Sequence, residues 1–252
     1  MRWTKAQAIC RPIRRAVAPL ALAALPVPAL AAIVVAASGP SAASYPVGKK
    51  LDAASPVVLR AGDSVTVLDQ GGTRVLRGAG TFTLGGAAAG SASPSGTLYA
   101  ALTRSRAASR VRTGAVRGDN TGPVQSPNLW YVDVSKAGPV CLPGTDAVRL
   151  WRADAAAPAA YVVAPASGGA KMTVAFAAGA MVAPWSGPVA DGASFVVAGP
   201  GGAGPGGRGA RTITLRVLPA VPADAEALGA VLIDKGCKAQ LDLLTSTLAQ
   251  PQ

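Results

Sequence analysis

The first forty residues of the chain combine a charged start with a long apolar run. Residues 1–15 hold five basic side chains and no acidic one, and the stretch Ala16–Ala37 that follows carries no charge. Small residues come next, from Ser38 to Ala43. This layout is typical of a secretory signal peptide. We therefore expect residues 1–43 to form a leader that is cut after Ala37 or Ala43.

An uncleaved membrane anchor is the alternative for this segment. The run 16–37 contains 22 residues, which is long enough for a helix to span a bilayer. Pro19, Pro26 and Pro28 count against a spanning helix, because proline lacks an amide donor and interrupts the helix. The positive flank stays in the cytoplasm in both cases. The sequence thus predicts an exported chain, either periplasmic or anchored in the inner membrane through residues 16–37.

Residues 45–84 have the pattern of a small β domain. Val65 and Val67 alternate with Ser64 and Thr66, as in a strand with one buried face. Glycine and aspartate turns separate short β-branched runs, which favours a meander of hairpins; the runs are 57–60, 64–69, 73–77 and 81–84. Forty residues bury little surface on their own, so we expect this sheet to pack on another part of the chain.

The residues of this unit resemble a known family. Leu59-Arg60-Ala61-Gly62-Asp63-Ser64-Val65-Thr66-Val67, a glycine turn, a second strand and Gly80-Thr81-Phe82 are similar to the FecR-type periplasmic β-domain. The resemblance covers about forty residues of the chain, and Val67 stands where the family pattern has threonine. It implies an extracytoplasmic signalling module that works with anti-sigma systems or outer-membrane receptors.

Residues 85–127 read as a linker with a basic segment. Gly85–Gly96 consists of glycine, alanine, serine and one proline, which is typical of a flexible connection. From Thr97 to Arg112 we expect a short basic helix. Its arginines could contact an anionic surface such as phospholipid headgroups, lipopolysaccharide or an acidic partner; these are Arg104, Arg106, Arg110 and Arg112. A solvated linker helix is the alternative, and the narrow apolar face favours it.

Residues 128–252 predict a second β unit, a sandwich or barrel, closed by two C-terminal helices. Turn residues separate the candidate strands at sandwich-like intervals; the strands are 129–134, 139–142, 147–152, 160–163, 172–177, 194–198 and 211–218. The glycine tract 199–209 reads as a hairpin loop. After Pro219 the apolar period changes to that of helices, one from about Pro222 to Gly236 and one from Cys237 to Leu248. The fold class is therefore mainly β with a two-helix cap.

Charge and composition narrow the possible functions. The net charge of +12 is concentrated in the first fifteen residues and the arginine segment, which argues against nucleic-acid binding over a folded surface. The chain has no histidine, which removes Ser-His-Asp and Cys-His catalysis and histidine-ligated zinc. The formal Gly-x-Gly-x-x-Gly match at 202–207 precedes a strand, whereas a dinucleotide fingerprint precedes a helix. We expect no catalytic residues, no metal and no cofactor.

Cysteines and aromatic residues supply the remaining candidates. Cys10 would leave with the leader, so Cys141 and Cys237 are expected to form one disulfide in an oxidising compartment; two unpaired buried thiols are the alternative. Trp130, Tyr131, Trp151 and Trp185 could stack on sugars if exposed. Their role as core of an alanine- and valine-rich unit is favoured.

Together these features predict a non-enzymatic exported envelope protein, a FecR-like signalling or regulatory module that acts by protein contacts. The alternative is a scaffold for envelope polymer or glycan that uses the basic segment and exposed tryptophans. The partner is accordingly expected to be another envelope protein or an envelope polymer.

Overall fold

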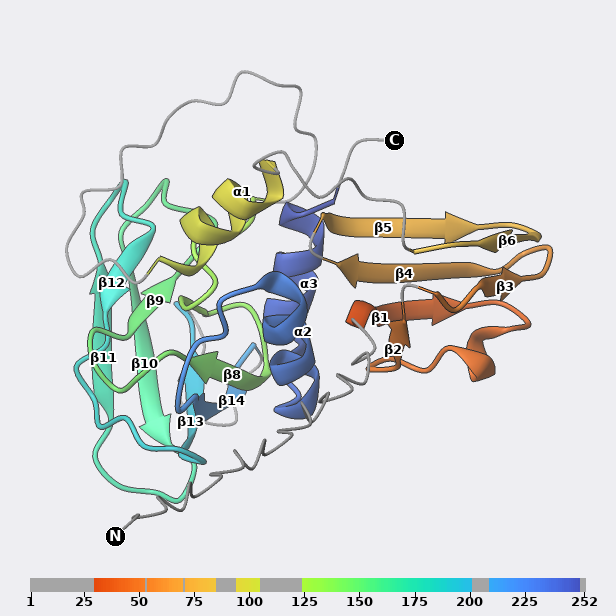
Figure 1. Cartoon of the computed structure of the whole chain (residues 1–252). Coiled ribbons are helices and arrows are strands. Elements are labelled where there is room, and N and C mark those ends of the chain that lie inside the picture. Colours follow the sequence, from red (N-terminus) through yellow and green to blue (C-terminus); the bar gives the residue numbers. More distant parts are fainter. Residues whose placement is uncertain are drawn as a thin grey trace, which may run out of the picture.

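The computed structural model describes residues 30–52, 54–69, 71–84, 94–104, 124–200 and 209–249. An N-terminal sheet projects from the body of the molecule on the right of Figure 1, a larger β unit lies on the left, and two C-terminal helices stand between them. Within the described residues the fold is mainly β, with fourteen strands and three α-helices. The expected fold class is confirmed.

The N-terminal unit contains two small antiparallel sheets. One has the strand order β2-β1-β4-β5, and the other pairs β3 with β6. The bounds are β1 Leu30–Ser38, β2 Lys50–Asp52, β3 Val57–Leu59, β4 Ser64–Asp69, β5 Gly72–Arg77 and β6 Gly80–Phe82. The four predicted strands are thus present, and β4–β5 forms the expected hairpin. The meander is modified because β3 pairs with β6 and not with its sequence neighbour.

Strand β1 corrects the expected boundary at residue 43. It pairs with β4 from Ile33 to Ser38 and with β2 from Leu30 to Ile33, at the centre of the sheet. Its residues 32–35 are buried. A cut after Ala37 or Ala43 would remove the central strand of this sheet, so the second half of the apolar run 16–37 belongs to the folded domain. Residues 1–29 lie outside the described residues.

The segment after β1 is held by aspartate and tyrosine side chains. Asp63 Oδ1 accepts a hydrogen bond from the Ser41 N–H (2.8 Å) and Oδ2 accepts one from the Arg60 N–H (2.5 Å). Hydrogen bonds from the side chain and the backbone N–H of Ser41 lower the pKa of Asp63. The Tyr45 hydroxyl accepts from the Val58 N–H (2.9 Å) and donates to the Val58 carbonyl (3.1 Å). Residues 39–45 are therefore a structural part of the domain.

Both faces of the four-stranded sheet are buried. Val65 and Val67 lie in a cluster with Val34 on one face, and Leu68 and Ile33 lie in the cluster that contains the helices on the other. Helix α2 (Ala225–Asp234) contacts β1 and β4. Its Gly229 faces the sheet so closely that a Cβ there would lie 2.8 Å from Leu68 Cδ2. The small β domain thus obtains its missing packing partner from the C-terminal end of the chain.

The second β unit has two sheets around a shared core. The strand orders are β11-β10-β13-β14-β8 and β12-β9-β7, and residues of both sheets form one buried cluster, which agrees with the sandwich prediction. Its strands are β7 Val132–Asp133, β8 Gly138–Leu142, β9 Arg149–Trp151, β10 Ala159–Pro165, β11 Met172–Phe176, β12 Val182–Pro184, β13 Ser194–Ala198 and β14 Arg211–Val217. The predicted hairpin β13–β14 is antiparallel, and its tip, residues 201–208, lies outside the described residues.

The helices connect the two β units. Helix α3 (Lys238–Thr247) contacts β8 of the second unit and β5 of the first, and α2 packs against α3. The expected helical cap is present, and it covers the N-terminal sheet as well. Of the described part of the chain, no helix has the length and hydropathy needed to cross a bilayer.

The expected linker is partly ordered core. Helix α1 (Pro94–Thr103) begins earlier than predicted, and Leu102 on it is buried. The Tyr99 hydroxyl donates to the Pro222 carbonyl (2.6 Å), and the Trp130 indole N–H donates to the Thr103 carbonyl (2.7 Å). Residues 94–104 therefore belong to the packed body, whereas 85–93 and 105–123 lie outside the described residues.

Gly39 offers a test of the corrected boundary. Its φ is +101°, and a Cβ there would lie 2.6 Å from both Asp63 Oδ1 and the Gly62 carbonyl oxygen. Gly62 also has a positive φ, +83°, but open space around its Cβ position. We expect Gly62→Ala to cost about 1–2 kcal/mol of unfolding free energy from backbone strain, and Gly39→Ala to cost at least about 1 kcal/mol more from overpacking. Urea unfolding of both variants measures the difference, and equal losses would contradict a structural role of residues 39–41.

Candidate functional site

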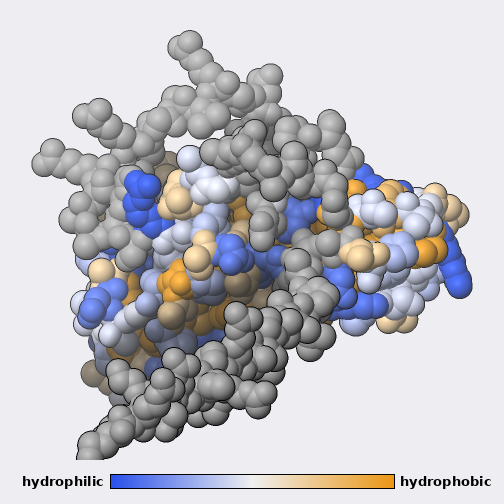
Figure 2. All heavy atoms as spheres, in the orientation of Figure 1, coloured by the Kyte–Doolittle hydropathy of each residue, from blue (hydrophilic) through white to orange (hydrophobic). Residues whose placement is uncertain are grey.

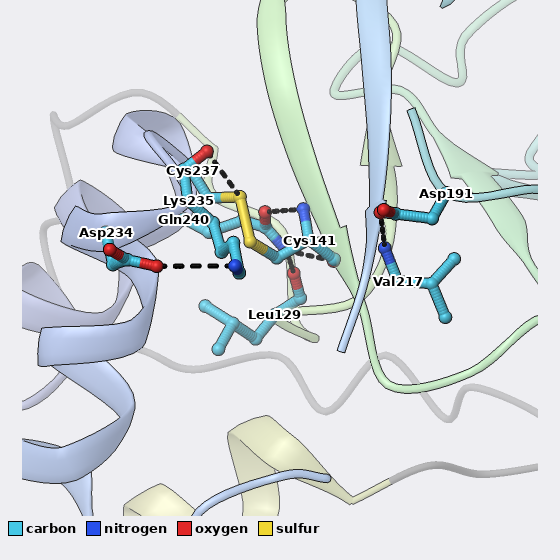
Figure 3. Close-up of a disulfide and its surroundings, with 8 residues drawn as sticks. All are labelled: Leu129, Cys141, Asp191, Val217, Asp234, Lys235, Cys237 and Gln240. Atoms are coloured by element: carbon cyan, nitrogen blue, oxygen red, sulfur yellow. Dashed lines mark hydrogen bonds and ion pairs between the residues drawn. A yellow bond between two sulfur atoms is a disulfide. The ribbon is translucent and has the colours of Figure 1, made fainter. Parts of the chain in front are cut away.

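The junction of helix α3 with strand β8 carries the best-defined site. Cys141 in β8 and Cys237, the residue before α3, form a disulfide with a Cα–Cα distance of 5.9 Å across 96 positions of sequence (Figure 3). Both cysteines are fully buried. The expected pairing is present, and a disulfide is typical of proteins in oxidising, extracytoplasmic compartments.

Gln240 completes this junction by hydrogen bonds. Its Oε1 accepts from the Cys141 N–H (2.6 Å), and its Nε2 donates to the Cys141 carbonyl (2.8 Å) and the Leu129 carbonyl (2.8 Å), as Figure 3 shows. The two bonds to Cys141 are those that a neighbouring strand would make with its N–H and its carbonyl. Pro139, which has no N–H, lies on the same edge. Strand β8, an edge strand of its sheet, is therefore closed to further strand pairing at this point.

A groove of about 430 Å³ opens beside the junction. It runs between α3, strand β8 and the segment 124–129. Its apolar wall includes Leu129, Val140 and Leu243, and Val124 at its edge exposes 60% of its surface. Figure 2 shows hydrophobic and hydrophilic residues intermixed over the visible part of the body of the molecule. An apolar concavity of this size fits a small molecule or a few side chains of a protein partner.

Polar groups of the groove are acidic on balance. Asp133 and Asp242 line it together with Lys136. Asp133 Oδ1 accepts from the N–H and the hydroxyl of Ser135, and neither carboxylate forms an ion pair among the described residues. The wall also contains Trp151, 2% exposed, whose indole N–H has no hydrogen-bond partner in the described part of the chain. A buried donor of this kind is costly unless an acceptor reaches it.

A second cavity, about 520 Å³, lies between α1, the β4–β5 turn and the start of α2. Asp69 and Asp224 line it, and Asp69 is paired with Arg74 at 2.7 Å. Glu226 is buried nearby and its Oε1 has no partner among described residues. Burial, and then the charges of Asp224 and Asp69, raise the pKa of Glu226. This group therefore affects the pH dependence of stability.

The other predicted site residues divide into two groups. Trp130, Trp151 and Trp185 are 5%, 2% and 8% exposed, so the core interpretation is confirmed for these three tryptophans, which are not available for stacking on sugars. Tyr131, the fourth aromatic residue of this set, is half-buried and lines the groove. Arg104 follows α1 and is exposed, whereas Arg106, Arg110 and Arg112 lie outside the described residues. In the described ranges no three His, Cys, Asp or Glu side chains gather as a metal site would require.

Sequence reasoning missed the two residues that define the junction and the groove. Gln240 sits in an ordinary helical pattern, and only its contact with β8 gives it a role. The aromatic pattern does predict Trp151 as a core residue, but its position on the groove wall depends on long-range packing. The glutamine between Cys237 and Leu241, on the face of the helix that also carries those residues, is the one signal that could have indicated a buried amide.

Comparisons with known proteins add no relative. No protein-family model matches the chain, and no curated protein and no solved structure matches it significantly.

Removal of the disulfide tests how firmly α3 is held on β8. A cross-link that closes a loop of 96 residues stabilises by about 4 kcal/mol in the chain-entropy model. We expect the double variant Cys141→Ala/Cys237→Ala to lose about this free energy of unfolding in urea. An unchanged midpoint in the double variant would show that the disulfide does not constrain the chain.

Glu226 predicts a pH dependence of stability. Because its pKa is raised in the folded state, its contribution is fully present below the unfolded pKa, about 4.3, and is lost as pH rises through the folded pKa. The neutral Glu226→Gln variant lacks this loss. We expect its unfolding free energy to match the wild type near pH 4 and to exceed it increasingly at higher pH. Asp242→Asn, an exposed change on α3, is the control; parallel curves for Glu226→Gln and wild type would refute the prediction.

Proposed function

We propose that the protein is a non-enzymatic envelope protein, exported to the periplasm, that acts by binding a segment of another envelope protein in the groove between α3 and β8. The observation that carries the proposal is the groove itself: an apolar wall and two carboxylates, Asp133 and Asp242, that form no ion pair among the described residues, next to the disulfide that joins α3 to β8. A regulatory role of FecR-like kind is the form of this function that the residues of β3 to β6 favour.

Export is supported by two independent features. The Cys141–Cys237 disulfide suits an oxidising space, and a basic segment followed by apolar residues precedes the folded part, as in secretory leaders.

The chemistry of the groove indicates the kind of segment that it would hold. Strand addition at β8 is disfavoured, because Gln240 occupies the free N–H and C=O of Cys141, so the partner must bind through side chains. An apolar side chain fits against Leu129 and Leu243. An arginine or lysine would complement Asp133 and Asp242. We propose an apolar residue flanked by a basic one as the recognised motif.

The polymer- or glycan-binding alternative loses its main support. The tryptophans on which it depended, Trp130, Trp151 and Trp185, are buried. Protein contact is the function that the described surface favours.

Site-specific photo-crosslinking in the exported full-length protein tests the proposal. A photoreactive residue at Val124, at the edge of the groove, should yield an adduct with a discrete protein in cells. Val47, which is 52% exposed on the N-terminal unit against 60% for Val124, is the matched control and should give no such adduct. The substitution Ala239→Arg, on the groove side of α3, should abolish the Val124 adduct without lowering the free energy of unfolding in urea by more than about 1 kcal/mol.

Three outcomes would overturn the proposal. Equal adducts at Val124 and Val47 would indicate non-specific contact, and no adduct at either position would remove the groove as a contact surface. An adduct of heterogeneous mass that lysozyme digestion shortens would assign the groove to envelope polymer instead of protein.

A further inference from the structure

We infer that export ends with cleavage at the start of strand β1, after Ala29 or Ala31, so that the mature chain begins at Leu30 or Ala32. This inference rests on the proposed export, and it replaces the cuts after Ala37 and Ala43 that the residue pattern alone suggests. A signal peptidase would hydrolyse one peptide bond: water supplies the hydroxyl of the new alanine carboxylate and a proton of the new α-amino group.

The first step is that the folded domain needs its residues from about 32 onward. Ala32 and Val34 are fully buried in one cluster, and Ile33 is buried in the other. Backbone hydrogen bonds also hold this segment in the sheet: the Val34 N–H donates to the Lys49 carbonyl (2.9 Å), and the Val34 carbonyl accepts from the Gly48 N–H (2.8 Å). A mature chain starting at residue 38 or 44 would leave β4 and β2 without the strand between them.

The second step is that β1 removes the membrane-anchor alternative. With residues 30–38 in the sheet, the apolar stretch available to a membrane shortens from 22 residues to the 14 of 16–29. A spanning helix needs about 20, and this stretch still contains three prolines. The ten residues from Ala16 to Leu25 fall instead within the length of a signal-peptide apolar core, about 7–15 residues.

The third step is the residue pattern at the new boundary. Ala29-Leu30-Ala31 has alanine at positions −3 and −1 of the bond after Ala31, and Val27-Pro28-Ala29 has valine at −3 and alanine at −1 of the bond after Ala29. Signal peptidases require such small side chains. The prolines at 26 and 28 end the apolar core just before the cut.

The pairing of β1 with β2 is compatible with a new N-terminus at Leu30. Leu30 lies opposite Asp52, and the ladder is irregular between Leu30 and Ala32. Asp52 is exposed, so the α-ammonium created by cleavage after Ala29 would lie beside a solvated carboxylate at the margin of the sheet.

N-terminal sequencing of the product tests the inference. The full chain is produced in a Gram-negative host with an intact secretion system, and the disulfide-bonded species is recovered from the periplasm. We expect a first residue of Leu30 or Ala32, with the intact mass in agreement. Ala29→Arg places a large charged side chain at −1 of one bond and −3 of the other, so this single change should block processing at both and retain the precursor at the membrane. Ala43→Arg, an exposed substitution at the rejected site, should be processed like the wild type.

The contrary results separate the two proposals. A periplasmic product that begins at Ser38 or Ser44, or an exported chain that stays uncut in the membrane, would overturn the cleavage site and leave export intact. An intact precursor in the cytosol with free thiols at 141 and 237 would overturn export itself. Normal processing of Ala29→Arg would also refute the proposed site.

Discussion

The attachment of helix α3 to strand β8 is the constraint on which the rest of the structure depends. The disulfide Cys141–Cys237 fixes the start of the helix, and Gln240, one turn further on, occupies the edge of β8 with two hydrogen bonds to Cys141 and adds a third to the Leu129 carbonyl. Because α2 packs on α3 and also on β1 and β4, this one attachment places the N-terminal sheet relative to the sandwich. Two β units that each bury a modest core are thereby joined through shared helices.

The interpretation of residues 16–37 shows how an apolar run can mislead. A strand buried on both faces has no polar–apolar alternation, so β1, with Val34 in one core and Ile33 in the other, reads like a continuation of a leader. The length of the apolar run could have separated the strand from a leader, because a run of 22 residues exceeds an ordinary signal-peptide core. The distinction becomes certain only when the partner strands β2 and β4 are placed beside it.

Local patterns predicted much of the fold, and long-range contacts account for what they missed. Strand β13 has the predicted bounds, 194–198, because alternation and turn residues are encoded within a few positions. Gln240 and Cys141 are 99 residues apart, and no local pattern links them. The short strand β12 escaped prediction because Val182–Pro184 is three residues long and pairs only with β9. The groove is likewise a property of packing: its walls come from α3, β8 and the segment before β7, and each is unremarkable in sequence.

Compartment and binding are coupled if the groove is the contact surface. One wall of the groove is α3 and another is β8, and the covalent link between them forms only where thiols are oxidised. In a reducing space the loss of about 4 kcal/mol would be a large share of the stability of a domain, and the loosened α3 would leave Cys141 and Leu129 without the Gln240 amide. Export would then do more than locate the protein. It would supply the oxidation that keeps the groove assembled, so that an unexported chain would present its partner with no complete site.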